Sequence, residues 1–92
     1  MEIVRKASAG TLESSDIMVM IEPGENDIEL ELNSAVEAKF GDSIRQTIRE
    51  VLTAQGVRCA KVYAYDRGAL DCTIRARVET AVKRAGEKER SI

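Results

Sequence analysis

Residues 17–21 form the most hydrophobic stretch of this chain, an unbroken run of Ile, Met, Val, Met and Ile. The run is short and partly β-branched, which indicates a strand over residues 16–22 that is buried on both faces. Pro23 and Gly24 follow it and are typical of a turn. Residues 27–33 then alternate hydrophobic with mostly acidic side chains, as in a strand with one buried face. Because only a short turn separates the two strands, we expect them to pair as a hairpin.

A longer segment from Ser34 to Gln55 has hydrophobic residues at helical spacing and is followed by a glycine, a common end of a helix. Ser34 and Glu37 stand at its start, which predicts a capping box with Ser34 as the N-cap. Gly41 and Asp42 interrupt the hydrophobic pattern, so we expect the helix to split or kink there. The segment therefore predicts an amphipathic helix with a defined start and end.

A further strand and a further helix complete the pattern. Residues 57–66 have the chemistry of a strand, residues 70–85 have helical periodicity, and residues 1–11 are expected to be extended. The order strand, strand, strand, helix, strand, helix predicts an α+β single-domain sandwich, in which a mostly antiparallel sheet of about four strands packs against two helices. We expect one domain over residues 1–86 and a charged, mobile tail over residues 87–92.

The 92-residue chain contains no histidine, and this limits its chemistry. A serine or cysteine nucleophile has no histidine partner within the chain. Two cysteines are too few for a disulfide framework, and a zinc site would need carboxylates to complete its four ligands. We therefore expect no catalytic residue and no metal site, and the composition favours a carrier or binding role.

The formal net charge of the chain is −2. Proteins that bind nucleic acid usually carry a clear positive excess, so we expect no nucleic-acid partner. The sequence has no hydrophobic run long enough to cross a membrane. We expect a soluble, cytoplasmic protein without a membrane partner.

Residues 9–16, Ala-Gly-Thr-Leu-Glu-Ser-Ser-Asp, place hydroxyl side chains in a polar connection between two extended segments. A serine in such a loop is accessible to another protein, although most loop serines only bond to the local backbone. The strand that follows Asp16 anchors one end of the connection, and Gly10 leaves the other end adjustable. We therefore expect Ser14 to present an exposed hydroxyl on a mobile loop beside a rigid strand.

Three separated segments of the chain resemble the acyl carrier (gamma) subunits of citrate lyase. One contains Ser14, and the others are Phe40–Arg45 and Asp66–Arg77. The likeness covers nearly the whole chain in unbroken order, and three motifs in register are more specific than one short pattern. The family pattern has glycine at the position of Ser15, and alignment on residues 10–13 matches the modified serine of the family to Ser14.

The resemblance implies that Ser14 holds 2'-(5''-phosphoribosyl)-3'-dephospho-CoA through a phosphodiester. A separate transferase attaches this group, and a ligase acetylates its terminal thiol. The alpha subunit then exchanges acetyl for citryl, and the beta subunit cleaves the citryl thioester to oxaloacetate and regenerates the acetylated carrier. The implied partners are the alpha and beta subunits of citrate lyase, the prosthetic-group transferase and the acetylating ligase.

Two alternative interpretations remain open. Asp42-Ser43-Ile44 resembles the attachment site of phosphopantetheine carriers, which would place the prosthetic group on Ser43. Those carriers are all-helical and follow their serine with an acidic helix, whereas strands precede Ser43 here and Arg45 and Arg49 follow it. The chain could also be a small non-catalytic interaction module that docks a partner on its basic last helix.

Overall fold

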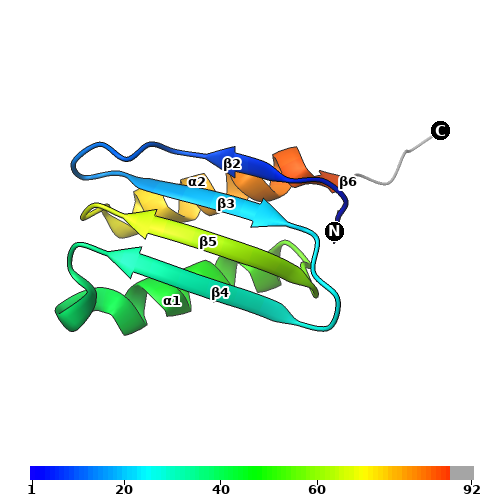
Figure 1. Cartoon of the computed structure of the whole chain (residues 1–92), viewed down its shortest axis with the longest axis horizontal. Helices are drawn as coiled ribbons and strands as arrows, with labels where there is room; N and C mark the ends of the chain where they lie inside the picture. The colour runs from blue at the N-terminus through cyan, green and yellow to red at the C-terminus, as the bar shows by residue number, and fades with distance from the viewer. Residues whose placement is uncertain (88–92) are drawn as a thin grey trace.

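The computed structural model describes residues 1–87, which form a four-stranded sheet with two helices on one face (Figure 1). The predicted α+β class, a mostly antiparallel sheet against two helices, is confirmed. The elements are β1 (Glu2–Ile3), β2 (Ala7–Ala9), β3 (Ile17–Glu22), β4 (Ile28–Ser34), α1 (Glu37–Ala54), β5 (Ala60–Asp66), α2 (Asp71–Ala85) and β6 (Gly86–Glu87).

The two chain ends of the described part meet in a small antiparallel ladder that the sequence did not predict. In it Glu2 lies opposite Glu87 and Ile3 lies opposite Gly86. The tail predicted over residues 87–92 therefore begins with a residue that belongs to β6. Its remaining part, residues 88–92, lies outside the described residues.

The order of strands in the main sheet is β2-β3-β5-β4, so the predicted hairpin of β3 and β4 is wrong. β5 lies between them, antiparallel to β3 and parallel to β4. The connection from β3 to β4 crosses the start of β5, where the Ala60 backbone N–H donates to the Asp27 carbonyl at 3.2 Å. Gly24 permits this crossing, because a Cβ at its position would lie 2.8 Å from the Ala60 nitrogen. The turn after β3 thus spans the width of one strand.

The side chains of β4 and β5 explain which of the two lies in the middle of the sheet. On β5, Ala60, Val62 and Ala64 are at most 1% exposed and face the helices. The hydrophobic residues of β4 are only half-buried, and Glu29 and Glu31 alternate with them in solvent. A strand with acidic side chains is suited to a sheet edge, since charges there discourage pairing with another chain.

Helix α1 differs from the prediction at its start and in its middle. It begins at Glu37, and no side chain caps it. Ser34 ends β4, where its hydroxyl donates to Asp66 at 2.8 Å and accepts from the Val36 backbone N–H at 3.0 Å. The Glu37 carboxylate accepts from Arg45 at 2.8 Å, so neither side chain forms the predicted capping box. The helix runs unbroken through Gly41, where the absence of a side chain leaves room for the Glu37 carboxylate. It ends as predicted, with Gly56 at φ +74°.

The core lies between the helices and one face of the sheet. Both helices contribute hydrophobic residues to it, and β3 contributes Ile17, Val19 and Ile21, each at most 1% exposed. The opposite side of β3 holds Met18 and Met20, which are half-buried, so the prediction that this strand is buried on both faces is wrong. Because both helices cover the same face, the other face of the sheet has no layer of the described chain over it (Figure 1).

Candidate attachment site

Ser14 lies in the connection between β2 and β3, at the end of the sheet where β4 and β5 finish and both helices begin (Figure 1). Every residue from Thr11 to Ser15 is exposed, which confirms the predicted exposure of Ser14. Within residues 1–87 no hydrogen bond involves the Ser14 hydroxyl. The hydroxyl is therefore free to react with a group that another protein presents.

Asp16 holds the loop that carries Ser14. Its carboxylate accepts from the Thr11 hydroxyl at 2.7 Å and from the Ile17 backbone N–H at 2.7 Å. Arg77 on α2 donates to both carboxylate oxygens, each at 3.1 Å. Such a bidentate pair fixes orientation as well as charge. The loop is thus closed upon itself and fastened to a helix more than 60 positions later in the sequence.

The same contacts change the acidity of Asp16. The hydrogen bonds from Thr11, Arg77 and the Ile17 backbone all favour the ionised carboxylate and lower its pKa from 3.8 to about 2. A group with a depressed pKa in the folded state stabilises the fold above its unfolded pKa, and this stability disappears as the pH falls towards the folded pKa. Asp16 should therefore stabilise the protein above about pH 4 and contribute progressively less towards pH 2.

Replacing Asp16 by Asn is expected to lower the free energy of unfolding by about 2 kcal/mol at pH 7, which is the equivalent of the lowered pKa. The side chain is only 13% exposed, so solvent screens the interaction little. Urea denaturation at pH 7 and at steps from pH 4 to pH 2 should show the difference from wild type shrinking as the pH falls. The exposed Asp42 is the matched control, and Asp42→Asn should cost less than about 0.5 kcal/mol. A pH-independent difference for Asp16→Asn would contradict the prediction.

The loop is also joined to the turn between β5 and α2. The Ser15 backbone N–H donates to the Arg67 carbonyl at 2.8 Å, and the Arg67 N–H donates to the Asp16 carbonyl at 2.9 Å. Gly10 has a role other than the adjustable end that the sequence suggested, because a Cβ at its position would overlap the Ile17 carbonyl oxygen. Its φ of +92° and the absence of a side chain allow the two sides of the loop to close. The structure thus fixes both ends of the loop and leaves its tip exposed.

Ser15 has a φ of +66°, the only positive φ of a residue other than glycine within residues 1–87. A left-handed backbone brings the Cβ of an L-residue close to the next carbonyl, which is why glycine suits the position. The glycine that the family pattern has at this position therefore fits the backbone observed here. Ser15 also donates its backbone N–H to Arg67.

Ser15→Gly is accordingly expected to raise the free energy of unfolding by about 0.5–1 kcal/mol. Glycine removes the strain of a left-handed backbone from the folded state. It also makes the unfolded chain more flexible, which cancels only part of this gain. Chemical denaturation of the purified variant measures the change. Ser15→Ala keeps the strained Cβ and should give no gain. Equal stabilisation by both substitutions would show that the serine hydroxyl, and not the backbone, causes the effect.

The other candidate serine, Ser43, lies in the body of α1, six residues after its first residue. Its side chain is exposed, but it does not open the helix, which is the position of the serine in the carriers that its motif resembles. The sheet that precedes it also differs from an all-helical carrier. Ser43 is therefore an ordinary exposed helix residue in this fold.

The sequence reasoning did not single out Asp16 and Arg77 as residues that position the Ser14 loop. Both lie inside the segments that carry the family resemblance, and their opposite charges were a usable signal for pairing. Among the described residues, no three side chains of the types His, Cys, Asp and Glu lie together as a metal site would need. No helix in this part of the chain is long and hydrophobic enough to span a membrane.

Comparisons with known proteins assign the family. A family profile described as malonate decarboxylase delta subunit (MdcD) matches residues 4–85. The chain is 51% identical over 89 residues to the citrate lyase acyl carrier protein of Enterobacter sp. (strain 638), covering 97% of this chain and 92% of the relative. It is 52% identical over 88 residues to that of Treponema denticola, covering 96% and 100%. A chain in the crystal structure of a Pseudomonas malonate decarboxylase hetero-tetramer in complex with malonate has the same fold, with a TM-score of 0.80, 20% identity and coverage of 91% and 87%.

A sheet with two helices on one face and an exposed serine loop at its end matches relatives that are acyl carrier subunits, and this defines a carrier subunit that is not itself catalytic. The relatives show that its cargo is an acyl group. The chain belongs to the family of citrate lyase acyl carrier proteins.

Proposed function

We propose that this chain is the acyl carrier of a citrate lyase complex and that Ser14 holds phosphoribosyl-dephospho-CoA through a phosphodiester. The observation that carries the proposal is the exposed Ser14 hydroxyl, free of hydrogen bonds within residues 1–87, on a loop fixed at both ends. This placement fits a bulky group, because Ser14 is exposed in a loop at one end of the sheet. When bound, the group supplies a terminal thiol that carries acetyl and citryl thioesters.

In this proposal the chain's own residues position the serine and do not activate it. Glu13 and Asp16 are the carboxylates nearest to Ser14 in sequence, and within residues 1–87 neither accepts a hydrogen bond from its hydroxyl. The Asp16 oxygens are engaged by Thr11, Ile17 and Arg77, and its pKa of about 2 makes it a poor base. Deprotonation of Ser14 during loading therefore belongs to a separate transferase. The partners are that transferase, an acetylating ligase, and the alpha and beta subunits of citrate lyase in the cytoplasm, where tethering keeps the acyl group at high local concentration.

Intact-mass measurement of the chain purified from its own host, followed by peptide mapping, tests the proposal. The expected result is an added mass equal to one phosphoribosyl-dephospho-CoA unit, located on the peptide that contains residues 9–16. An added mass equal to phosphopantetheine on the peptide that contains Ser43 would support the other type of carrier. A chain that copurifies with lyase subunits but carries no added mass would contradict the proposal.

A further inference from the structure

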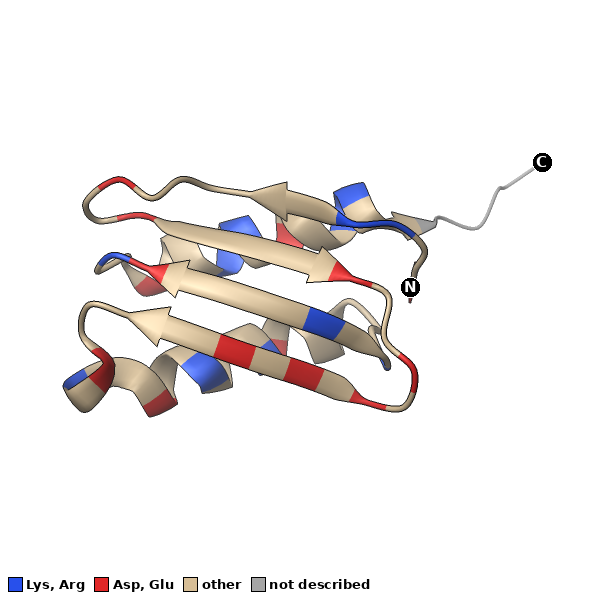
Figure 2. Cartoon of the chain, viewed as in Figure 1, with Lys and Arg blue, Asp and Glu red and all other residues tan. Residues whose placement is uncertain are grey.

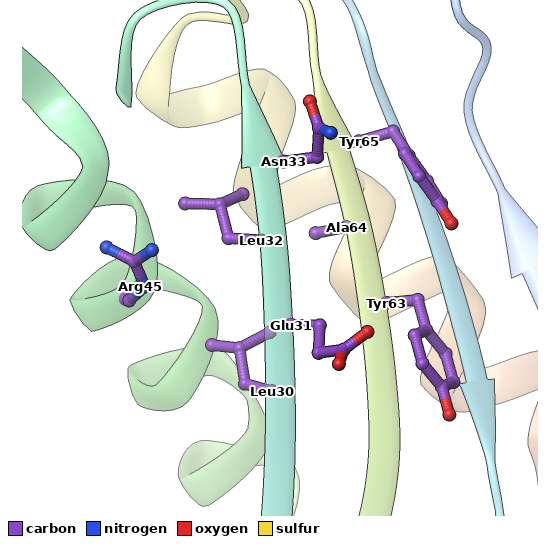
Figure 3. Close-up of a pocket in the computed structure, with 8 residues that line it drawn as sticks. All are labelled: Leu30, Glu31, Leu32, Asn33, Arg45, Tyr63, Ala64 and Tyr65. Carbon is purple, nitrogen blue, oxygen red and sulfur yellow. The ribbon is translucent and has the colours of Figure 1, made fainter. Parts of the chain in front are cut away.

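The face of the sheet that the helices leave open carries both tyrosines of the chain. Tyr63 and Tyr65 lie on β5, one of the two inner strands of the sheet, with Met20 and Met18 opposite them on β3. A recess of about 470 Å³ runs along β4 and β5 beside them. Figure 3 shows how its lining side chains divide: Leu30, Leu32 and Arg45 lie on the helix side, while Glu31, Asn33, Tyr63 and Tyr65 lie on the open side.

On the open side, polar groups of β4 stand beside the aromatic rings of β5. Asn33 is in register with Tyr65, and Glu31 is in register with Tyr63. Asn33 and Glu31 are exposed, and Tyr65 is 40% exposed, so an incoming molecule can reach all three. An aromatic ring on an open sheet is a platform on which a nucleobase stacks, and an asparagine amide matches the hydrogen-bonding edge of adenine.

This platform leads directly to the Ser14 loop. Residues 63, 65 and 67 follow one another along β5 and the turn after it, and the Arg67 carbonyl accepts the Ser15 N–H at 2.8 Å. The Arg67 side chain is exposed and forms no ion pair within the described residues. A phosphodiester on Ser14 would therefore have a free guanidinium at the adjoining turn, and the tyrosines lie further along the same strand.

The charges on β4 limit which part of an attached nucleotide can lie on the sheet. Glu29 and Glu31 lie on β4 and are coloured red in Figure 2. Lys61 on β5 is in register with Glu29. An uncharged base is tolerated beside Glu31, whose carboxylate accepts from an exocyclic amine. A diphosphate at the same place is repelled. The acidic edge thus favours the base on the sheet and directs the phosphates away from it.

We propose that the open face of the sheet is a nucleoside site, in which the adenine of the group attached to Ser14 stacks on Tyr65 and Tyr63 and hydrogen-bonds to Asn33. Arg67 pairs with the phosphodiester. The inference rests on the proposed attachment at Ser14 and adds to it a binding site for the nucleotide part of the arm. The pantetheine part then leaves the sheet into solvent, where partner subunits reach it.

Tyrosine emission provides a direct test, because the chain has two tyrosines and no tryptophan. The chain is loaded by its transferase, and loading on the Ser14 peptide is verified by mass. Emission of the loaded chain is expected to fall at least about twofold below that of the unloaded chain, since a stacked base quenches the ring. The unloaded Ser14→Ala variant with equimolar free dephospho-CoA controls for absorption by the nucleotide. Equal emission of loaded and unloaded chains would overturn the nucleoside site and leave the carrier assignment intact.

Residue-specific evidence comes from NMR spectra of the same two samples. We expect the Asn33 side-chain amide and the Tyr65 ring protons to shift on loading, and Asn33→Ala to load normally by mass while restoring most of the lost tyrosine emission. Glu29→Ala is the matched control on the same strand and face, and its loaded form should be quenched like the wild type. Shifts confined to residues 11–16 would overturn the proposal, because they would place the whole arm in solvent.

Discussion

Ser14→Ala is expected to abolish loading of the carrier completely and to leave its fold intact. The hydroxyl is the only reactive group of this side chain, and no neighbouring side chain is bonded to it within residues 1–87. The free energy of unfolding should change by less than about 0.5 kcal/mol, because the residue is exposed. Incubation with the transferase and its nucleotide substrate, followed by intact-mass measurement, gives the first result, and a urea denaturation curve gives the second.

Two other exposed serines, Ser15 and Ser43, provide the controls for this experiment. Ser15→Ala and Ser43→Ala should both load, because each keeps Ser14 and the loop contacts of Asp16. A modified Ser14→Ala chain would move the attachment site, and modification of Ser15 would be the first alternative to map. If Ser14→Ala instead lowered stability as much as a core substitution, Ser14 would be a structural residue, and its proposed role as an exposed attachment site would be wrong.

Asp66→Ala is expected to have the largest effect on stability outside the hydrophobic core, a loss of about 2–4 kcal/mol. Asp66 is 1% exposed and lies at the end of β5. Its carboxylate accepts from the Ser34 hydroxyl at 2.8 Å and from the backbone N–H groups of Gly68 and Ala69 at 3.2 and 3.0 Å. Alanine would remove the buried acceptor of these partly buried donors, and urea denaturation at pH 7 measures the cost.

Ser34→Ala separates the two parts of this network. It removes the hydroxyl that links β4 to Asp66 and accepts from the Val36 N–H, but it keeps the turn after β5, so its cost should be only about 1–2 kcal/mol. The double variant should be less destabilised than the sum of the single variants, because the two groups share a hydrogen bond. A loss below about 1 kcal/mol for Asp66→Ala would contradict the prediction and indicate that water replaces the carboxylate.

The class of fold was predictable from hydrophobic spacing, but the order of the strands was not. The alternation in β4 and the helical periodicity of α1 and α2 are local features, and each gave the correct type of element. The pairing of β3 with β5 joins Ile17 to Asp66 across 49 positions, and no local pattern encodes it. The short turn at Gly24 suggested a hairpin of β3 and β4. The prediction failed because the sequence does not reveal that this turn passes over another strand.

The site was also only partly predictable, because the sequence reveals local features but not contacts between distant residues. The exposure of Ser14 followed from a polar stretch between extended segments, and the comparison with a family pattern selected this serine. The clamp between Asp16 and Arg77 is a contact across the fold, so it required the structure. The predicted capping box failed because the Ser34 oxygen accepts from the Val36 backbone N–H and the Glu37 carboxylate accepts from Arg45.

The inner position of β5 has a consequence for folding during synthesis on the ribosome. Both neighbours of β5 precede it in the sequence, so β3 and β4 lack their shared partner until residue 66 has been synthesised. Until then the nascent chain exposes the hydrophobic side of Ile17–Glu22 and an unpaired strand edge, features that favour aggregation. Sheet formation must wait for contacts between distant residues, which makes folding slow for a chain of this size. The last strand made in this sheet is thus the one that allows the earlier strands to assemble.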